Sequence, residues 1–386
     1  MIETGFSYLA FLVFLAGGLK LWESKSKNKF FEYVPAIVLL YLVVMLGSTF
    51  NVWTTDDAIK ATRGTLKNTL LPAMIFLMLL KSDLRQIKKL GGKMLLGFFA
   101  ASITIGIGFV GSFAIFGKWL DPLAWKSFAA LSGSWMGGTG NMAAIQGALN
   151  LPDSSMGYTL LIDSIDYSIW VMLLLALVPY GKVFNKLTGA STETLDRVSA
   201  ELSKNNETKK EIQFVDMIFL LGLSLAMSSF AIFAAQYLPQ TSFLTASTWK
   251  VLIVTVLGVV FAMTPIGKIA GSSEISNTML YIIVALMASS ANFGELTKAP
   301  IYIIAGLVII LIHAGLMFVV AKIFKLDLFT CGVASLANIG GVASAPILAA
   351  AYSEALIPVG VLMAMLGYII GTGGGLIVGK ILSLMI

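Results

Sequence analysis

The stretch LSGSWMGGTGNMAAIQG, residues 131–147, places polar side chains and five glycines within an otherwise apolar chain. Of the 386 residues, 58% are hydrophobic and 12% are charged, whereas an average soluble domain has roughly 25% charged residues. This composition indicates an all-α integral membrane protein without a large soluble domain. A polar, glycine-rich segment inside such a chain is the first candidate for a functional site.

Ten apolar runs predict helices that cross the membrane, because about twenty residues at roughly 1.5 Å each span a hydrocarbon core of roughly 30 Å. The runs are 5–20, 34–50, 69–80, 94–117, 158–178, 214–237, 250–263, 277–290, 299–322 and 356–385. Runs 69–80 and 277–290 are short, and we expect them to extend into the polar residues that follow. The N-terminus carries Glu3 and no basic residue, so it lacks the positive region of a cleaved signal peptide and is expected to remain as the first span.

The chain has one cysteine, Cys331, and one histidine, His313. An internal disulfide and a Cys/His zinc site are therefore excluded, and we expect no enzymatic activity and no cofactor other than a coupling ion. The formal net charge of +6 comes from Lys and Arg residues that lie mainly in loops, where positive charge sets the orientation of a membrane protein. It does not indicate a nucleic-acid partner.

The long polar segment 181–213 divides the chain near its middle, and we expect it to be a cytoplasmic linker. The second half contains CGVASLANIGGVASAPILAA (residues 331–350), which overlays the opening stretch when Gly137-Gly138 is set on Gly340-Gly341, an offset of 203 residues. A second match, at an offset of 209, sets 76–87 on 285–296. These ordered matches predict two repeats, 1–180 and 214–386. The alternative is that glycine-rich membrane segments align by composition alone.

The glycine-rich segments 126–150 and 328–352 are either re-entrant hairpins or ordinary crossing helices. As hairpins, they leave five crossings in each half, and the second half is inverted relative to the first. This arrangement, with both termini outside, places most of the 26 basic residues inside and obeys the positive-inside tendency better than twelve crossings do. We therefore expect two inverted repeats of five transmembrane helices, each with one re-entrant hairpin.

Each hairpin arm has about ten residues, or roughly 16 Å of helix, so the two tips are expected to meet near the bilayer midplane from opposite faces. Non-helical backbone at that depth is tolerated only where protein or water surrounds it, and the ends of half-helices offer N–H groups to an anion and carbonyls to a cation. The predicted solute-binding residues are Ser134, Gly137, Gly138, Thr139, Asn141, Asn338, Gly340, Gly341 and Ser344. The alternative is close helix packing through small residues, which we expect for the stripe Gly371, Gly375 and Gly379.

Asp163 and Asp166 lie three residues apart on one face of the next span, near mid-depth. Charge at that depth is costly, so such residues usually serve an ion or solute path, and neighbouring carboxylates repel unless a cation lies beside them. We predict a Na⁺-coupling site formed by Asp163, Asp166, Ser132 and Ser335. Proton coupling and a structural pair satisfied by hydroxyl groups are the alternatives. Leu366 stands at the equivalent of Asp163, so any ion site is asymmetric.

Four further polar residues are secondary candidates: Ser289, Ser290, Asn292 and His313. The first three end a span that has almost no charge. His313 lies halfway along an apolar helix, where it is either a buried hydrogen-bonded residue or part of a proton or substrate path. Asp83, which the second overlay sets on Asn292, is either functional or a solvated charge near Arg85.

The motifs GSWMGGTGN (133–141), ANIGGVASAP (337–346) and SDLRQI (82–87) resemble the uncharacterised bacterial membrane-protein family called domain-of-unknown-function 819. That family is similar, more distantly, to the glutamate/sodium, 2-hydroxycarboxylate (citrate) and bile-acid/sodium symporters. Those symporters carry Gly-Gly-x-Gly tips. The first tip keeps this pattern as Gly137-Gly138-Thr139-Gly140, whereas the second reads Gly340-Gly341-Val342-Ala343. The resemblance implies a sodium-coupled secondary transporter with a mobile core domain and a scaffold domain that dimerises.

Taken together, the patterns and the resemblance predict Na⁺-coupled symport of a small organic anion or an amino acid or peptide, by an elevator-type alternating-access mechanism. The expected partners are an anionic or zwitterionic solute, the lipid bilayer and a second copy of the chain. The alternative is a Na⁺/H⁺ antiporter that uses Asp163 and Asp166. A membrane enzyme would need a reactive constellation, and a scaffold protein a large interaction domain, and the sequence has neither.

Overall fold

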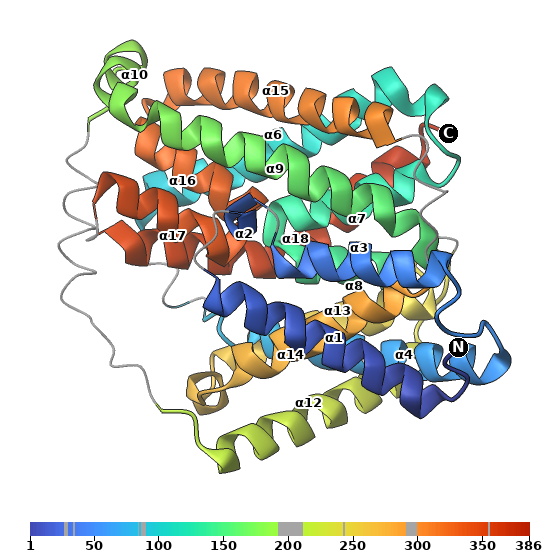
Figure 1. Ribbon diagram of the computed structural model, residues 1–386. Helices are drawn as coiled ribbons and strands as arrows, with labels where there is room; N and C mark the ends of the chain where they lie inside the picture. The colour runs from blue at the N-terminus through green and yellow to red at the C-terminus, as the bar shows by residue number, and fades with distance from the viewer. Residues whose placement is uncertain are drawn as a thin grey trace.

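The computed structural model consists of α-helices and short 3-10 turns throughout the part of the chain that it describes (Figure 1). The described residues are 1–26, 30–33, 35–83, 85, 90–191, 211–241, 244–290, 299–353 and 356–386. Each of the ten predicted spans falls on a helix. The chain is therefore all-helical and crosses a membrane several times, as the composition predicts.

The first half contributes α1 (Gly5–Lys25), α2 (Phe30–Tyr33), α3 (Ala36–Thr49), α4 (Asp57–Leu79), α6 (Gly91–Phe116), α7 (Ala124–Gly137), α8 (Thr139–Ala148), α9 (Met156–Leu177) and α10 (Gly181–Thr188). The second half contributes α12 (Phe214–Ala234), α13 (Ala246–Ala262), α14 (Ser272–Ala288), α15 (Ala299–Phe324), α16 (Leu328–Ile339), α17 (Gly341–Tyr352) and α18 (Ile357–Ser383). Within the described chain, six segments are long and apolar enough to cross a membrane: those of α1, α6, α9, α12, α15 and α18.

The two short predicted spans, 69–80 and 277–290, belong to helices that extend toward the N-terminus, whereas the sequence predicted extension toward the C-terminus. Helix α4 begins at Asp57, where Asp56 caps it by accepting a hydrogen bond from the Ile59 amide at 2.9 Å, and it ends at Leu79. Helix α14 begins directly after Gly271 and ends at Ala288. The expectation that these spans extend into the polar residues after them is therefore wrong, because the start signals lie upstream of the apolar runs.

Two clusters of buried apolar side chains organise the helices. One unites α6, α9, α15, α16 and α17, which lie in the upper part of Figure 1 and are called here the upper bundle. The other unites α1, α3, α4, α12, α13 and α14, the lower bundle. Helices α7, α8 and α18 lie between the two bundles and contribute side chains to one or both clusters. The glycine-rich segments therefore lie where the bundles meet.

Helices α7 and α8 form an antiparallel pair that is broken at Gly138. At its open end, Lys126 Nζ donates to the Leu149 carbonyl at 2.9 Å, and Thr248 at the start of α13 donates to the Ala148 carbonyl at 3.0 Å. Helices α16 and α17 form a second antiparallel pair. At its open end, the end away from the turn, the rings of Phe329 and Tyr352 pack together with their centroids 5.2 Å apart.

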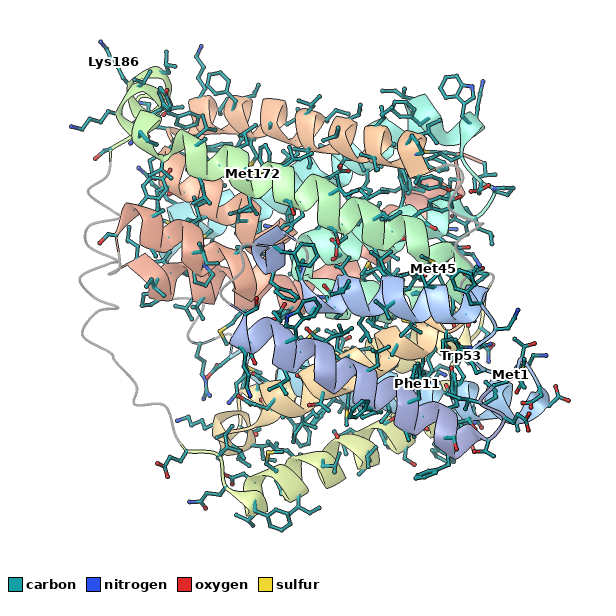
Figure 2. All side chains as sticks on the ribbon, viewed as in Figure 1. Met1, Phe11, Met45, Trp53, Met172 and Lys186 are labelled. Atoms are coloured by element: carbon teal, nitrogen blue, oxygen red, sulfur yellow. The ribbon has the colours of Figure 1, made fainter. Side chains whose placement is uncertain are left out.

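The two helix pairs open toward opposite sides of the molecule. In Figure 1, α16 and α17 enter from the left, the side of α10, whereas α7 and α8 enter from the right. The Asn185 Oδ1 of α10 accepts a hydrogen bond from the Leu328 amide at 2.9 Å, which ties the start of α16 to that side. Lys186 marks the same side in Figure 2. The ends at which the two pairs turn therefore point toward each other.

Helices at corresponding places in the two halves have matching dimensions. Helices α1 and α12 have 21 residues each, and α6 and α15 have 26 each. Contacts between α6 and α15 run in opposite directions, because Thr104 pairs with His313 whereas Ser112, farther along α6, bonds to Ala305, farther back on α15. Helices α6 and α15 are therefore antiparallel.

Candidate functional site

The first helix pair turns at Gly138, whose φ of 91° and ψ of 170° are accessible only to glycine. The Asn141 side chain fixes this turn through both its amide nitrogen and its amide oxygen. Its Nδ2 donates to the Gly137 carbonyl at 2.7 Å, which caps the end of α7, and its Oδ1 accepts from Thr372 Oγ1 of α18 at 2.6 Å. Asn141 therefore holds the tip in place, and its side-chain hydrogen bonds are made within the protein.

The second pair turns at Gly340 and at Gly341, whose φ is 59°. Gly341 is the residue that the 203-residue offset sets on Gly138, so both tips have a glycine with positive φ at the same place. Asn338 is buried, and its Nδ2 donates to the Ala334 carbonyl at 2.9 Å while its Oδ1 accepts from Ser102 of α6 at 2.7 Å. Asn338 therefore ties the second tip to α6.

Helix α18 passes between the two tips. A side chain at Gly367 would approach Met136 O and Gly137 Cα of the first tip to 3.0 and 3.2 Å, and Ala337 O of the second to 3.3 Å. The tips are therefore separated by little more than one backbone. The predicted glycine stripe packs here as well, since a Cβ on Gly371 would lie 2.8 Å from Gly137 Cα. Further along, Gly375 meets Gly133, and Gly379 meets Ala129.

Asp163 of α9 is bonded to the first helix pair. Its Oδ1 accepts hydrogen bonds from Ser134 Oγ and Trp135 Nε1, each at 3.0 Å. Both donors are on α7, so one carboxylate oxygen connects α9 to the arm that leads to the first tip. Two donors stabilise negative charge on this oxygen.

Asp166, one turn further along α9, has a different environment. It is completely buried, and neither of its carboxylate oxygens has a hydrogen-bond partner within the described part of the chain. A Cβ on Gly306 of α15 would overlap Asp166 Oδ2, so the carboxylate lies directly against that glycine. A carboxyl group in such a place is costly to keep ionised unless a cation lies beside it, and protonation removes that cost. The two acids on one helix face therefore differ in their need for a ligand.

A chain of hydrogen bonds runs through His313. The Nε1 of Trp170 donates to Ser335 Oγ at 2.8 Å, and Ser335 Oγ lies 2.8 Å from His313 Nε2. On the other side of the ring, His313 Nδ1 lies 2.8 Å from Thr104 Oγ1, which also donates to the Ala100 carbonyl. A neutral imidazole with its proton on Nδ1 satisfies every group in this chain. The arrangement matches a buried, hydrogen-bonded histidine.

The structure brings some of the predicted ion-site residues together and separates others. The hydroxyl that reaches Asp163 is that of Ser134, whereas Ser132 donates to the Ala129 carbonyl of its own helix. Ser335 bonds to Trp170 and His313. Ser344, at the start of α17, lies with the ring of Tyr167 against Gly340. Thr139 begins α8 directly after the first turn.

The secondary candidates at the end of α14 lie in the lower bundle, away from the tips. The Ser289 carbonyl accepts from Trp53 Nε1 at 3.0 Å, and its hydroxyl bonds to Tyr8. Figure 2 shows Trp53 beside Phe11 in this region. Ser290 donates to the Met287 carbonyl at 3.1 Å. Asn292 lies outside the described residues.

Asp83 lies in the turn after α4 and forms a two-point ion pair with Arg85. Arg85 Nη2 lies 2.8 Å from Asp83 Oδ2, and Arg85 Nε lies 2.9 Å from Asp83 Oδ1. Hydrogen bonding to Arg85 lowers the pKa of the Asp83 carboxyl. Asp83 is therefore ionised and paired with a neighbour in the sequence.

Several residues near the tips were missed by the sequence reasoning. Trp135 holds Asp163, Thr372 holds Asn141, and Tyr167 and Tyr368 lie against the two tips, with Tyr368 Cε1 3.6 Å from a Cβ placed on Gly138. A sequence signal for Tyr167 was available. Asp163, Asp166, Tyr167 and Trp170 recur at helical spacing, which predicts one polar and aromatic face along α9.

The family described as "Protein of unknown function (DUF819)" matches residues 10–385 of this chain. The chain therefore belongs to the DUF819 family, which confirms the resemblance seen in its motifs. A relative, the "Uncharacterized membrane protein YjcL" of Bacillus subtilis (strain 168), is 24% identical over 336 residues, with 82% of each chain covered.

Proposed function

We propose that this protein is a secondary active transporter that moves a small organic anion or zwitterion, such as an amino acid or a short peptide, together with Na⁺. The observation that carries the proposal is the meeting of two broken helix pairs on either side of Gly367. They lie next to Asp163 and to Asp166, whose carboxylate has no hydrogen-bond partner among the described residues. Helices broken at mid-membrane are the usual sites of solute and ion binding in secondary transporters. Membership of a membrane-protein family is compatible with this role.

The proposal includes two inverted repeats, each with a re-entrant hairpin. It is supported by the equal lengths of α6 and α15, by their antiparallel contact and by the positive φ at both Gly138 and Gly341. The opposite entry sides of the two helix pairs support it as well (Figure 1). In this arrangement α7/α8 and α16/α17 are the hairpins. The protein lies in the inner membrane of a bacterial cell, and both termini are on the external side of that membrane.

The solute site that we propose lies at the two tips. The start of α8 offers amides and the Thr139 hydroxyl, and the start of α17 offers amides and the Ser344 hydroxyl. Helix N-termini favour a carboxylate through their N–H groups. Because Asn141 and Asn338 are hydrogen-bonded within the protein, we assign them to holding the tips in shape. Tyr167 and Tyr368 would enclose the solute.

Asp166 is the proposed coupling residue. Asp163 already has two hydrogen-bond donors, whereas the Asp166 carboxylate has none within the described chain and lies against Gly306. A cation beside Asp166 would offset the cost of burying its charge and would change that cost each time it bound or left. The proposal contains no covalent chemistry and no cofactor other than this coupling ion.

The proposed mechanism is an elevator movement of the upper bundle, with both hairpins, against the lower bundle. Its basis is the separation of the two apolar clusters: α8 packs in the cluster of the lower bundle, and α7 and α18 contribute side chains to both. The lower bundle would be the scaffold that forms a homodimer. Rigid-body movement of one bundle past another around a fixed site is a common way to alternate access.

Antiport of a cation and protons is the second candidate. It is favoured by Asp166, whose carboxylate has no hydrogen-bond partner in the part of the chain that the structure describes. A carboxylate without hydrogen bonds can exchange a proton for Na⁺ with no organic solute. The two functions differ in one measurement: a Na⁺ gradient drives proton movement in the absence of solute only in an antiporter.

The experiment is to reconstitute the purified protein in liposomes that contain a pH-sensitive dye and to impose a Na⁺ gradient. Uptake of radiolabelled amino acids, dipeptides and dicarboxylates is measured with and without that gradient. Symport requires uptake that depends on Na⁺ and saturates with solute. If Na⁺ moves protons in the absence of solute, antiport is correct, and if neither process exceeds that of empty liposomes, the transport proposal fails.

A further inference from the structure

We infer that a pocket between α4, α8 and α13 binds a small anion that carries both a phosphate group and a hydroxyl group. The pocket has a volume of about 160 Å³, and its polar lining consists of Lys67, Asn68, Gln146, Asn150, Ser247 and Lys250. It lies at the open end of the first helix pair, away from the tips. The binding inference is therefore independent of the proposed transport function.

The charges that line this pocket are unbalanced. Lys67 forms an ion pair with Asp153, so its charge is compensated. Lys250, which is partly buried, bonds through Nζ to Asn68 Oδ1, a neutral amide oxygen, and it forms no ion pair within the described part of the chain. One positive charge therefore remains uncompensated at the pocket. Such a charge is stabilised by an anion, and phosphate oxygens accept charge-assisted hydrogen bonds from an ammonium group.

Gln146 provides the second observation. Its side chain is only 1% exposed, and its Nε2 donates to the Leu151 carbonyl at 3.0 Å and to Asp153 Oδ1 at 2.5 Å. Its Oε1 is buried and has no partner among the described residues. A buried acceptor without a donor is costly. Gln146 is one of the residues that line the pocket, so a ligand with a hydroxyl group beside its negative charge would suit both Gln146 and Lys250.

Two sources share this chemistry. Hydrogenphosphate carries its own P–OH, and the headgroup of phosphatidylglycerol carries glycerol hydroxyls beside its phosphate. Either would bridge α8, which belongs to the first helix pair, and the lower-bundle helices α4 and α13. Occupancy would therefore hold that pair against the lower bundle.

The test uses the full chain, purified in a neutral detergent and stripped of lipid. The thermal unfolding temperature is measured as sodium phosphate replaces sodium chloride at constant ionic strength, and native mass spectrometry measures retention of phosphatidylglycerol against phosphatidylethanolamine. The variants are Lys250→Gln and the charge-preserving Lys250→Arg. Lys60→Gln is the control, because Lys60 is an exposed lysine near the start of α4, one of the helices that border the pocket, and does not line the pocket.

The wild type, Lys60→Gln and Lys250→Arg should bind one of the two ligands with a saturable response. Lys250→Gln should bind it about tenfold more weakly or worse, which corresponds to the loss of one charge-assisted hydrogen bond. A response to free phosphate identifies the soluble anion, and retention of phosphatidylglycerol alone identifies the lipid headgroup. The inference is overturned if the wild type responds to neither ligand, or if Lys250→Gln binds as tightly as Lys60→Gln.

Discussion

Thr372 of α18 donates a 2.6 Å hydrogen bond to Asn141 Oδ1, and the same Asn141 side chain caps the end of α7 through Gly137. Both residues are buried. The conformation of the first tip is thus fixed by a helix that is more than two hundred residues away in the sequence. Changes in α18 are therefore expected to reach any ligand that binds at the tip.

Replacing Thr372 with Val should weaken ligand binding at the tip and lower the unfolding temperature. The substitution removes the donor to Asn141 Oδ1 and leaves a buried acceptor unsatisfied, at a cost of about 1 kcal/mol or more. The measurements are thermal unfolding and Na⁺-dependent solute binding by calorimetry. Asn141→Ala should have a larger effect, because it also removes the cap on Gly137.

Thr278→Val is the control for this pair, since Thr278 is exposed and donates to the Glu274 carbonyl of its own helix. It should leave both measurements unchanged. If Asn141→Ala binds solute and Na⁺ as the wild type does, the first tip is not part of the solute site.

Replacing Asp166 with Asn should abolish Na⁺-dependent binding while the protein stays folded. The amide cannot supply the negative charge that a cation requires. The substitution also removes a buried carboxylate that has no hydrogen-bond partner among the described residues, so thermal stability without Na⁺ should be equal or higher. The measurement is the Na⁺-induced rise in unfolding temperature.

Asp163→Asn separates the roles of the two acids. Its Oδ1 can still accept from Ser134 and Trp135, so the local structure should survive and Na⁺ dependence should be retained in part. Asp57→Asn, at the exposed start of α4, is the matched control. Unchanged Na⁺ dependence in both single variants would assign the acid pair to a structural role.

The close passage of α18 between the two tips can be tested by enlarging a residue at the contact. Gly367→Ala forces a Cβ to within 3.0 Å of Met136 O and 3.3 Å of Ala337 O, so the tips must move apart. We expect a destabilisation of about 1–3 kcal/mol, the usual cost of overpacking, and a loss of solute binding. Gly373→Ala has open space around it and should be neutral or stabilising, because alanine favours a helix more than glycine does. Equal behaviour of the two variants would contradict the tight contact.

Much of the fold could be predicted from sequence, because both length and apolarity are local properties. The breaks at Gly138 and Gly341 also follow from local chemistry, since positive φ favours glycine. The start of α4 could not be placed, because Asp56 looked like one of several polar residues until its bond to Ile59 was seen. The capping residue Asp56, and not the start of the apolar run, sets where α4 begins.

The partners of the polar side chains were beyond the reach of sequence reasoning. Periodicity places Asp163 and Asp166 on one face of α9, but it cannot say that Trp135 bonds to one of them and that Gly306 lies against the other. In the same way, Ser132 and Ser134 are equivalent in pattern, yet only Ser134 reaches Asp163. A hydroxyl group in a helix can always bond to a carbonyl of its own helix, so polarity alone does not reveal a site.

The orientation of the chain is tested by labelling single cysteines in intact cells. Lys186 lies on α10, which contacts the start of α16, and Figure 2 shows it at the opposite end of the molecule from Trp53. Asp57 begins α4 a few residues after Trp53, so we expect Lys186 and Asp57 on opposite sides of the membrane. The positive-inside tendency places the α10 side in the cytoplasm. Asp57→Cys should therefore react with a membrane-impermeant maleimide, and Lys186→Cys should react only after the cells are opened. The native Cys331 is buried and should stay unlabelled. Labelling of Lys186→Cys from outside would reverse the proposed orientation, and labelling of both positions from outside would contradict the arrangement of five crossings in each half.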